Sequence, residues 1–153
     1  MTEAEIDKAL DNKAYRIKYN AIINPNATPT NINKALDDNN NILVRQYSVK
    51  NKNASPANID KALDDKDEYV GVVAIRHKNA TPANIDKALN NKSTNVRKYA
   101  TEHENASEAN INKALDDDNI KVKLAAMNHQ NASKANKEKA YNDPELIAYL
   151  LKH

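Results

Sequence analysis

One nine-residue motif recurs along the chain at an almost constant interval, and this repetition constrains the fold more strongly than any other feature. The clearest copy reads Thr-Pro-Ala-Asn-Ile-Asp-Lys-Ala-Leu and starts at Thr81. Successive copies are separated by 26, 27, 26, 26 and 26 residues, and they start at Thr2, Thr28, Ser55, Thr81, Ser107 and Ser133. A repeat of this length is too small to bury its own apolar face, so it must stack on its neighbours. The sequence therefore predicts one repeat domain over residues 1–153, with repeats at about 2–27, 28–54, 55–80, 81–106, 107–132 and 133–153.

Each repeat carries the pattern of two short helices. In the fourth repeat, Thr81 is a favoured N-cap residue and Pro82 occupies the first helical position. The apolar residues that follow recur at i, i+3 and i+4, as one face of a helix requires: Ile85, Ala88 and Leu89. A second helix is expected from about Ser93 to about His103. The predicted fold class is all-α, an α-solenoid of six two-helix repeats of about 26 residues.

The second helices share two further sets of aligned positions. One apolar column is expected to face inward: Ile17, Val44, Val70, Val96, Val122 and Ala148. The residues expected to cap the second helices are Asp38, Asp65, Asn91, Asp117 and Asp143. The chain has only one glycine, Gly71, so asparagine is expected to make the turns, because asparagine tolerates left-handed backbone conformations.

The junctions between repeats resemble those of bacterial HEAT-like repeats of the leucine-rich-repeat-variant type. The resemblance rests on Asn24-Pro25-Asn26-Ala27-Thr28-Pro29 and on the Val-Arg pairs Val44-Arg45 and Val96-Arg97. It implies a HEAT-like solenoid that acts as a binding scaffold, with the second helices on the concave side. A related family carries an iron–sulfur segment held by cysteines, and this chain has no cysteine.

Composition and motifs argue against several classes of function. Without cysteine, the chain can form no disulfide, no thiolate metal site and no cysteine nucleophile. It carries no Gly-rich phosphate loop, no H-E-x-x-H motif and no nucleophile–base set. A non-enzymatic protein without cofactor or metal is therefore expected. No apolar run has the length of a membrane span, and a cytoplasmic location in the producing or host cell is expected.

Two polar columns are expected to serve stacking. The first holds Asn24, Asn51, His77, His103 and His129. Equivalent atoms of stacked repeats lie roughly 10 Å apart, whereas zinc needs ligands at about 2 Å, so these histidines cannot share an ion. They are expected to bond carbonyl groups at the ends of the second helices. The second column is expected to bond backbone groups between stacked loops: Asn26, Asn53, Asn79, Asn105 and Asn131.

Two basic columns leave two interpretations open. The first column is Lys8, Lys34, Lys61, Lys87, Lys113 and Lys139. It could face a polyanion, or acids three and four residues farther on, such as Asp37 and Asp38, could neutralise it. The second column holds Lys18, Arg45, Arg97 and Lys123, is interrupted by Gly71, and is expected to tie neighbouring repeats together through the acidic turns.

Function is expected where the repeats differ, on the second helices. Tyr and Arg, which dominate interface energetics, occur among these variable positions. The predicted partner-binding residues are Gln46, Tyr47, Lys50, Tyr69, Arg76, Lys98, Tyr99, Glu102 and Lys121. They predict an adaptor that binds another protein. One alternative is a non-specific nucleic-acid binder that uses the Lys or Arg columns. Another is a structural, self-assembling component, for which Tyr149, Leu150 and Leu151 would be uncovered; the high Asn and Lys content fits an AT-rich genome such as many phages have.

Overall fold

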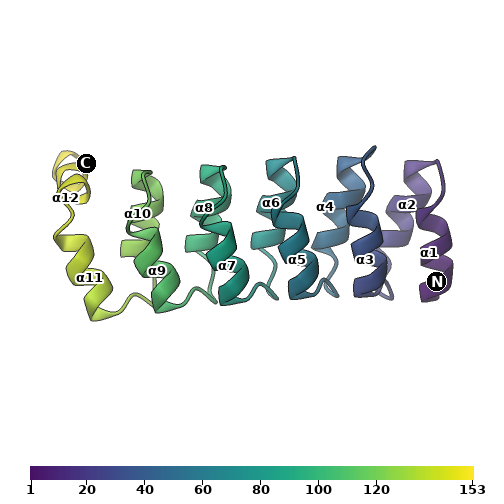
Figure 1. Ribbon diagram of the computed structural model, residues 1–153, viewed down its shortest axis with the longest axis horizontal. Coiled ribbons are helices and arrows are strands. Elements are labelled where there is room, and N and C mark those ends of the chain that lie inside the picture. The colour runs from purple at the N-terminus through teal and green to yellow at the C-terminus, as the bar shows by residue number, and fades with distance from the viewer. The chain divides into compact units, whose positions relative to one another are not determined.

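A computed structural model describes all 153 residues, and its regular structure consists of twelve α-helices (Figure 1). The helices are α1 (Glu3–Leu10), α2 (Tyr15–Ile22), α3 (Pro29–Leu36), α4 (Ile42–Lys50), α5 (Pro56–Leu63), α6 (Glu68–Ile75), α7 (Pro82–Ala88), α8 (Thr94–Thr101), α9 (Glu108–Ala114), α10 (Ile120–Met127), α11 (Lys134–Tyr141) and α12 (Pro144–Lys152). Internal contacts divide the chain into an N-terminal unit, Met1–Ala80, and a C-terminal unit, Thr81–His153. The fold is all-α and built from two-helix repeats, as the repetition predicts.

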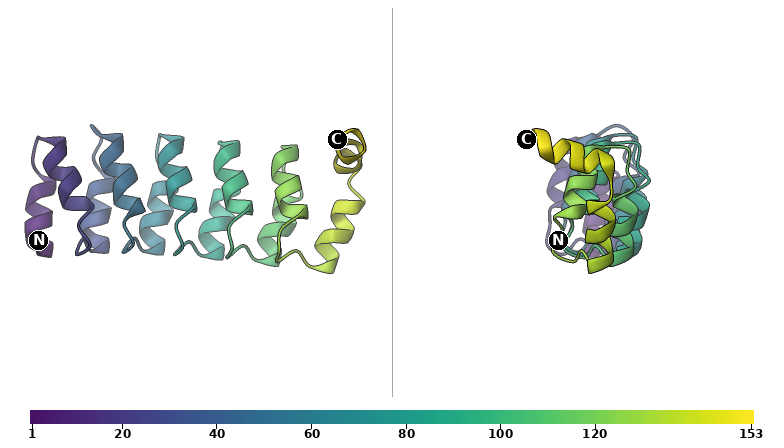
Figure 2. Two further views of the ribbon diagram at one scale, coloured as in Figure 1. Left: turned by 180° about the vertical axis from the view of Figure 1, so that it is seen from behind. Right: turned by 90° about the vertical axis from the view of Figure 1, so that its left-hand side faces the viewer.

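In the N-terminal unit, three helix pairs stack side by side. Each first helix packs on the second helix of its own repeat, and α1, α3 and α5 form one layer (Figure 1). Helices α2, α4 and α6 form the other layer, which Figure 2 shows from behind. The C-terminal unit repeats this arrangement, with α7, α9 and α11 in one layer and α8, α10 and α12 in the other.

The predicted apolar columns form much of the core of both units. The isoleucines of the first helices have no exposed surface: Ile6, Ile32, Ile59, Ile85 and Ile111. The valines of the second helices are equally buried: Val44, Val70, Val96 and Val122. Full burial of such a side chain contributes roughly 1.5–3 kcal/mol, so these columns hold the repeats together.

The predicted inward column is wrong at its two ends. Ile17 is 44% exposed, because α2 has another second helix, α4, on only one side. Ala148 is exposed, and Leu146 occupies the buried place instead. The shift arises because Asp143 caps α12 directly and Pro144 starts it, so that Leu146 is the third residue of its helix, as Val122 is in α10.

The first helices begin as predicted, with Thr or Ser at the N-cap. In α7, the Thr81 hydroxyl accepts a hydrogen bond from the Asn84 backbone N–H, and the Asn84 side chain accepts one from the Thr81 N–H. Such a capping box satisfies two backbone donors that have no partner within the helix. The same arrangement recurs at α1, α3, α5, α9 and α11.

Four of the five predicted caps of the second helices are wrong, and only Asp143 is correct. The caps are Asn41, Asp67, Ser93 and Asn119, in place of Asp38, Asp65, Asn91 and Asp117. The side chains predicted to cap lie earlier in the loop and accept the N–H of the residue two positions farther on. Asp65, for example, accepts the Asp67 N–H at 2.9 Å. Both arrangements use a short polar side chain as an acceptor, which is why the pattern alone misplaces the helix start.

Asparagine does not make the turns through left-handed backbone, as the composition suggested. No residue of the chain has a positive φ. The asparagines act instead through their side chains, which accept N–H groups two residues on, as Asn24 does from the Asn26 N–H at 3.0 Å. A chain with a single glycine can therefore make tight turns without entering the left-handed region.

Candidate functional site

Within each unit, a column of Asn and His residues joins a repeat to the preceding one, and both residue types bond a backbone N–H of their own repeat and a carbonyl oxygen of the preceding repeat. Asn51 accepts the Asn53 N–H at 3.0 Å and donates to the carbonyl oxygens of Ile22 and Asn24. In the corresponding position, His77 Nδ1 accepts the Asn79 N–H at 3.1 Å, and Nε2 lies 3.1 Å from the Asn51 carbonyl oxygen.

His129 repeats this geometry in the C-terminal unit. Its Nδ1 accepts the Asn131 N–H at 3.0 Å, and its Nε2 lies 3.1 Å from the His103 carbonyl oxygen. Since a backbone N–H can only donate and a carbonyl can only accept, the proton is on Nε2 and the ring is neutral. The acceptor carbonyl belongs to the preceding repeat, and not to the last turn of the same helix as the sequence suggested.

The junction asparagines bond between repeats, as predicted. Asn53 Nδ2 donates to the carbonyl oxygens of Pro25 and Ala27, both at 2.8 Å. Asn131 Nδ2 donates to those of Glu104 and Ala106, both at 3.0 Å. These bonds satisfy loop carbonyls that no helix pairs.

A third asparagine column was missed by the sequence reasoning. It is the capping-box position of the first helices, where Asn58 Nδ2 also donates to the Pro29 carbonyl oxygen at 3.1 Å. Asn110 does the same to Pro82 at 3.2 Å. The signal was the invariance of this Asn from the second repeat to the sixth, whereas Glu5, which has no amide to donate, occupies the position in the first.

The second basic column forms ion pairs between repeats, as predicted. Arg45 Nε lies 2.7 Å from Asp65 Oδ2, and the two side chains are only 5% and 8% exposed. Its second contact, from Nη2 to Asp65 Oδ1 at 3.2 Å, makes the pair bidentate. Each pair joins residues twenty positions apart: Lys18–Asp38, Arg45–Asp65, Arg97–Asp117 and Lys123–Asp143.

These pairs shift the pKa values of their members in the C-terminal unit. The hydrogen bond from Lys123 lowers the pKa of Asp143, against the opposing effect of burial. Burial acts to raise the pKa of Asp117, but hydrogen bonds from Arg97 and from the Asn119 N–H outweigh it, so this pKa is also lowered. Both carboxylates are therefore held in the ionised form.

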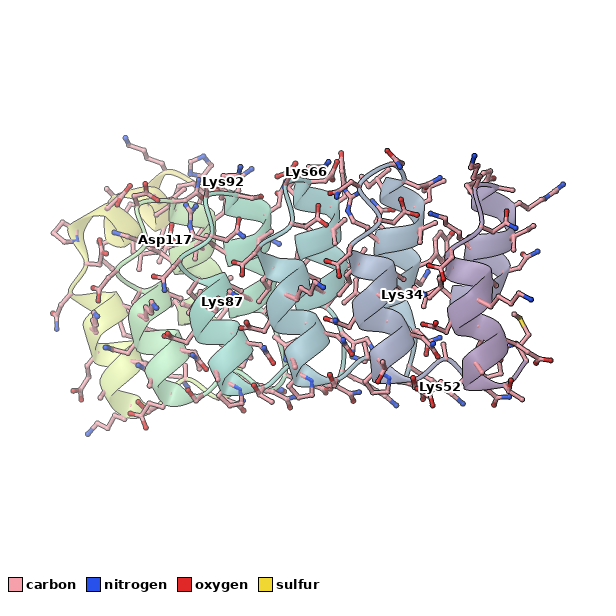
Figure 3. All side chains as sticks on the ribbon, turned by 45° about the vertical axis from the view of Figure 1, so that its right-hand side comes forward. Lys34, Lys52, Lys66, Lys87, Lys92 and Asp117 are labelled. Atoms are coloured by element: carbon pink, nitrogen blue, oxygen red, sulfur yellow. The ribbon has the colours of Figure 1, made fainter.

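The first lysine column is also engaged between repeats, but not with the predicted acids. Lys34 lies on the side of α3 that faces α1 (Figure 3), and its Nζ is 3.0 Å from Asp7 and 2.9 Å from Asp11. Hydrogen bonds to Asp11 and then Asp7 raise its pKa, against burial. Asp37 and Asp38, the predicted partners, pair instead with other cations. Lysines farther along the column reach back similarly: Lys61 to Asp37, Lys113 to Asp86 and Lys139 to Asp116.

The predicted partner-binding residues all lie on or directly after the second helices. Lys50, Tyr69, Arg76, Glu102 and Lys121 are exposed. The remaining four are half-buried: Gln46, Tyr47, Lys98 and Tyr99. Several of them meet in grooves, but Tyr69 stands apart in the first turn of α6, roughly 10 Å along the helix from Arg76.

Two grooves in the N-terminal unit lie at the carboxyl ends of the second helices. One, of about 460 Å³, is lined by Lys50, Lys52, Val73, Arg76, His77 and Lys78. The other, of about 330 Å³, is lined by Ile23, Pro25, Tyr47, Lys50, Asn51 and Lys52. Sequence reasoning missed Lys52 and Lys78 because they follow the helices in the junctions; their common position in consecutive repeats was the available signal.

The C-terminal unit has a groove of different character. It measures about 640 Å³, and its charged lining residues are Lys98, Glu102, Glu104 and Lys121. Lys98 forms an ion pair with Glu102 and also lies 5.3 Å from the centre of the Tyr99 ring. The cations of this groove are therefore balanced by carboxylates.

No group of three or more His, Cys, Asp or Glu side chains is placed to hold a metal ion. None of the helices combines the length and the apolar character needed to span a membrane. At the end of α12, Leu150 and Leu151 are exposed and Tyr149 stacks on His153 with ring centres 4.3 Å apart.

Comparison of the chain with protein-family models gives no match, and comparison with curated protein sequences gives none either.

Proposed function

We propose that this protein is a non-enzymatic, HEAT-like adaptor that binds another protein through the exposed face of its second helices. The observation that carries the proposal is that recurring and variable side chains have different places in the structure. Side chains that recur in most repeats contact a neighbouring repeat of their unit, as the Arg45–Asp65 pair and the Asn58 amide do. The variable side chains of the second helices, including Tyr69 at 64% exposure, remain at the surface.

The chemistry of this face supports recognition of a protein. Tyr47 packs edge-on against Tyr19 with ring centres 4.8 Å apart, and the Lys50 ammonium lies 5.6 Å from the Tyr47 ring centre. An aromatic side chain held in place by its neighbours loses little conformational entropy on binding, which favours affinity. The carboxylates of the chain serve largely as caps, turn acceptors and ion-pair partners. The proposed function is therefore binding without catalysis.

Site-specific photo-crosslinking in an extract of the native cell tests this function. A photoreactive residue at Tyr69 of α6 is expected to crosslink a partner protein, whereas the same residue at Ala57, exposed on the first helix α5, is not. The triple variant Tyr47→Ala, Arg76→Ala, Tyr99→Ala, shown to be folded by circular dichroism, is expected to lose the product. Undiminished capture by that variant, or crosslinking from Ala57 alone, would contradict the proposal.

A further inference from the structure

Lysines of the first helices reach acids of the preceding repeat, and these acids occupy only two aligned positions. The ion pairs are Lys34 with Asp7 and Asp11, Lys61 with Asp37, Lys113 with Asp86 and Lys139 with Asp116. Asp86 aligns with Asp7, and Asp37 and Asp116 align with Asp11. A lysine of one repeat therefore meets an acid at a fixed place on the repeat before it.

The first and the sixth repeat carry the two halves of one more such pair. Lys8 continues the lysine column in the first of the six repeats, none of which precedes it, and its side chain is exposed. Glu138 continues the position of Asp7 in the sixth repeat. Its side chain is 63% exposed and lies 3.7 Å from Lys134 of its own helix, a contact at the surface that contributes little. The two charges would meet if α1 of one molecule stacked on α11 of another as α3 stacks on α1.

A second aligned position differs in charge on the same two faces. In the second repeat, Asn31 Nδ2 donates at 3.3 Å to the carbonyl oxygen of Glu3, the first residue of the preceding first helix. The first repeat carries the exposed Glu5 in place of this asparagine. The first residue of α11 is Lys134, where the other first helices begin with Pro or Glu, and Lys137 replaces the buried isoleucine one turn later. A carboxylate on the α1 face thus corresponds to cations on the α11 face.

The second helices offer apolar surface on both faces. Leu150 and Leu151 of α12 are 44% and 84% exposed, and Ile17 of α2 is 44% exposed. The residues that align with Leu150 are all buried: Ala21, Ser48, Ala74, Ala100 and Ala126. Three residues that align with Leu151 have no exposed surface: Ile22, Val49 and Ile75. Covering the exposed side chains would therefore extend the apolar columns that already join the repeats.

The ion pairs between second helices stop at both faces in a matched way. Ile147 of α12 follows the buried Leu146, as Lys123 follows Val122 in α10, so an apolar residue replaces the cation. In the first repeat, Asn12 accepts the Ala14 N–H at 2.8 Å and stands where later turns carry Asp38 or Asp65. Since neither the cation nor the acid is present, a contact between these two faces leaves no buried charge unpaired in this layer.

We propose that molecules of this protein associate head to tail, with the α1–α2 face of one copy on the α11–α12 face of a second copy. Figure 1 shows α1 and α2 at one edge of the N-terminal unit, and α11 and α12 at one edge of the C-terminal unit. Lys8 of one copy then pairs with Glu138 of the other. Glu5 lies beside the cations of α11, and the exposed leucines of α12 cover Ile17. This association goes beyond the adaptor function, and because two different faces meet it leads to rings or filaments.

Sedimentation velocity over a range of protein concentrations tests the association. The sedimentation coefficient of the wild type is expected to rise with concentration, and to rise less at high salt. Lys8→Glu and Glu138→Lys each bring like charges together in every contact and should weaken association about tenfold or more. The controls Lys52→Glu and Glu104→Lys make the same charge changes at exposed junction positions and should change it less than about twofold.

An equimolar mixture of Lys8→Glu and Glu138→Lys tests which faces meet. One contact between the two variants pairs the two substituted faces, whose charges are again opposite, and the reverse contact pairs the two unchanged faces. The mixture is therefore expected to associate about tenfold more strongly than either variant alone. Leu150→Ser with Leu151→Ser, shown to be folded by circular dichroism, should also weaken association of the otherwise unchanged chain.

Three results would overturn the proposal. The first is a wild type that remains monomeric at every concentration. The second is a response to only one of the Lys8→Glu and Glu138→Lys substitutions, because a symmetric dimer through one face, or an unrelated contact, would behave in that way. The third is a mixture that associates no more strongly than its two components.

Discussion

His77 and His129 occupy a position at which the first two repeats carry asparagine, and the geometry explains why both residue types fit. Each presents one acceptor to the N–H two residues farther on and one donor to a carbonyl of the preceding repeat. The imidazole Nδ1 and Nε2 thus replace the amide Oδ1 and Nδ2. Hydrogen-bond function at this site is conserved while residue identity changes.

Substitutions of His129 distinguish the contribution of these two hydrogen bonds to stability from that of the packing of the ring. His129→Ala leaves the Asn131 N–H without its acceptor and removes one of the two donors of the His103 carbonyl, which keeps the Ala106 N–H. The substitution is expected to reduce the free energy of unfolding by about 1–3 kcal/mol. His129→Asn can restore both bonds and should cost less than about 1 kcal/mol. Urea unfolding of the two variants provides the measurement, and equal losses would show that packing of the ring, and not its hydrogen bonds, matters.

At the scale of helices, ion pairs within each unit connect α2, α4, α8 and α10 to the turn before the next second helix. Arg45 on α4 contacts Asp65, and its Nη1 also donates to the Asp38 carbonyl oxygen at 2.8 Å. Asp65 in turn accepts the Asp67 N–H, so one carboxylate holds both the turn and the preceding repeat. Gly71 stands at the position equivalent to Arg45, and Asn91 stands at the position equivalent to Asp65; neither residue is charged.

Removal of the Arg45 charge should be costly unless the Asp65 charge is removed as well. Arg45→Met leaves a nearly buried carboxylate unpaired and is expected to lower the free energy of unfolding by about 3–5 kcal/mol. The double variant Arg45→Met with Asp65→Asn keeps the turn acceptor without a charge and should recover at least half of that loss. Thermal and urea unfolding measure both variants. A double variant that is less stable than the single one would refute this account.

At the scale of the whole molecule, carboxylates link successive repeats within each of the two units, and this makes stability sensitive to acid. The pKa values of Asp117 and Asp143 are lowered in the folded state. The unfolded chain therefore takes up protons at a higher pH than the native protein. The stabilising contribution is complete above the ordinary Asp pKa of about 3.9 and is lost as the pH falls through the lowered values.

Unfolding free energy measured as a function of pH tests this linkage. The wild type is expected to be stable from neutral pH down to about pH 5 and to lose stability below about pH 4. Asp117→Asn should be less stable at neutral pH and show a shallower decline in acid, because the group whose pKa is lowered is gone. If the unfolding free energy of the variant fell with pH as steeply as that of the wild type, Asp117 would not contribute to the acid sensitivity.

Much of the fold follows from periodicity alone. The interval of 26 residues places equivalent positions of neighbouring repeats together, so the isoleucine and valine columns and the pairing of Arg45 with a neighbouring acidic turn could be predicted. The first-helix caps were equally accessible, because Ser or Thr before an apolar stripe is a local signal. The second-helix caps could not be predicted in this way, since Asp65 and Asp67 are both suitable acceptors and lie only two residues apart.

The candidate site shows the limit of that reasoning. The sequence by itself determined the two-helix repeat, its stacking and the variable second-helix positions such as Tyr47 and Arg76. Only the tertiary structure decided which acids the lysines contact, because each lysine can reach several: Lys34 pairs with Asp7 and Asp11 and not with Asp37. The groove at Lys50 and Lys52 could not be predicted from the sequence, because it combines helix ends and junctions from consecutive repeats.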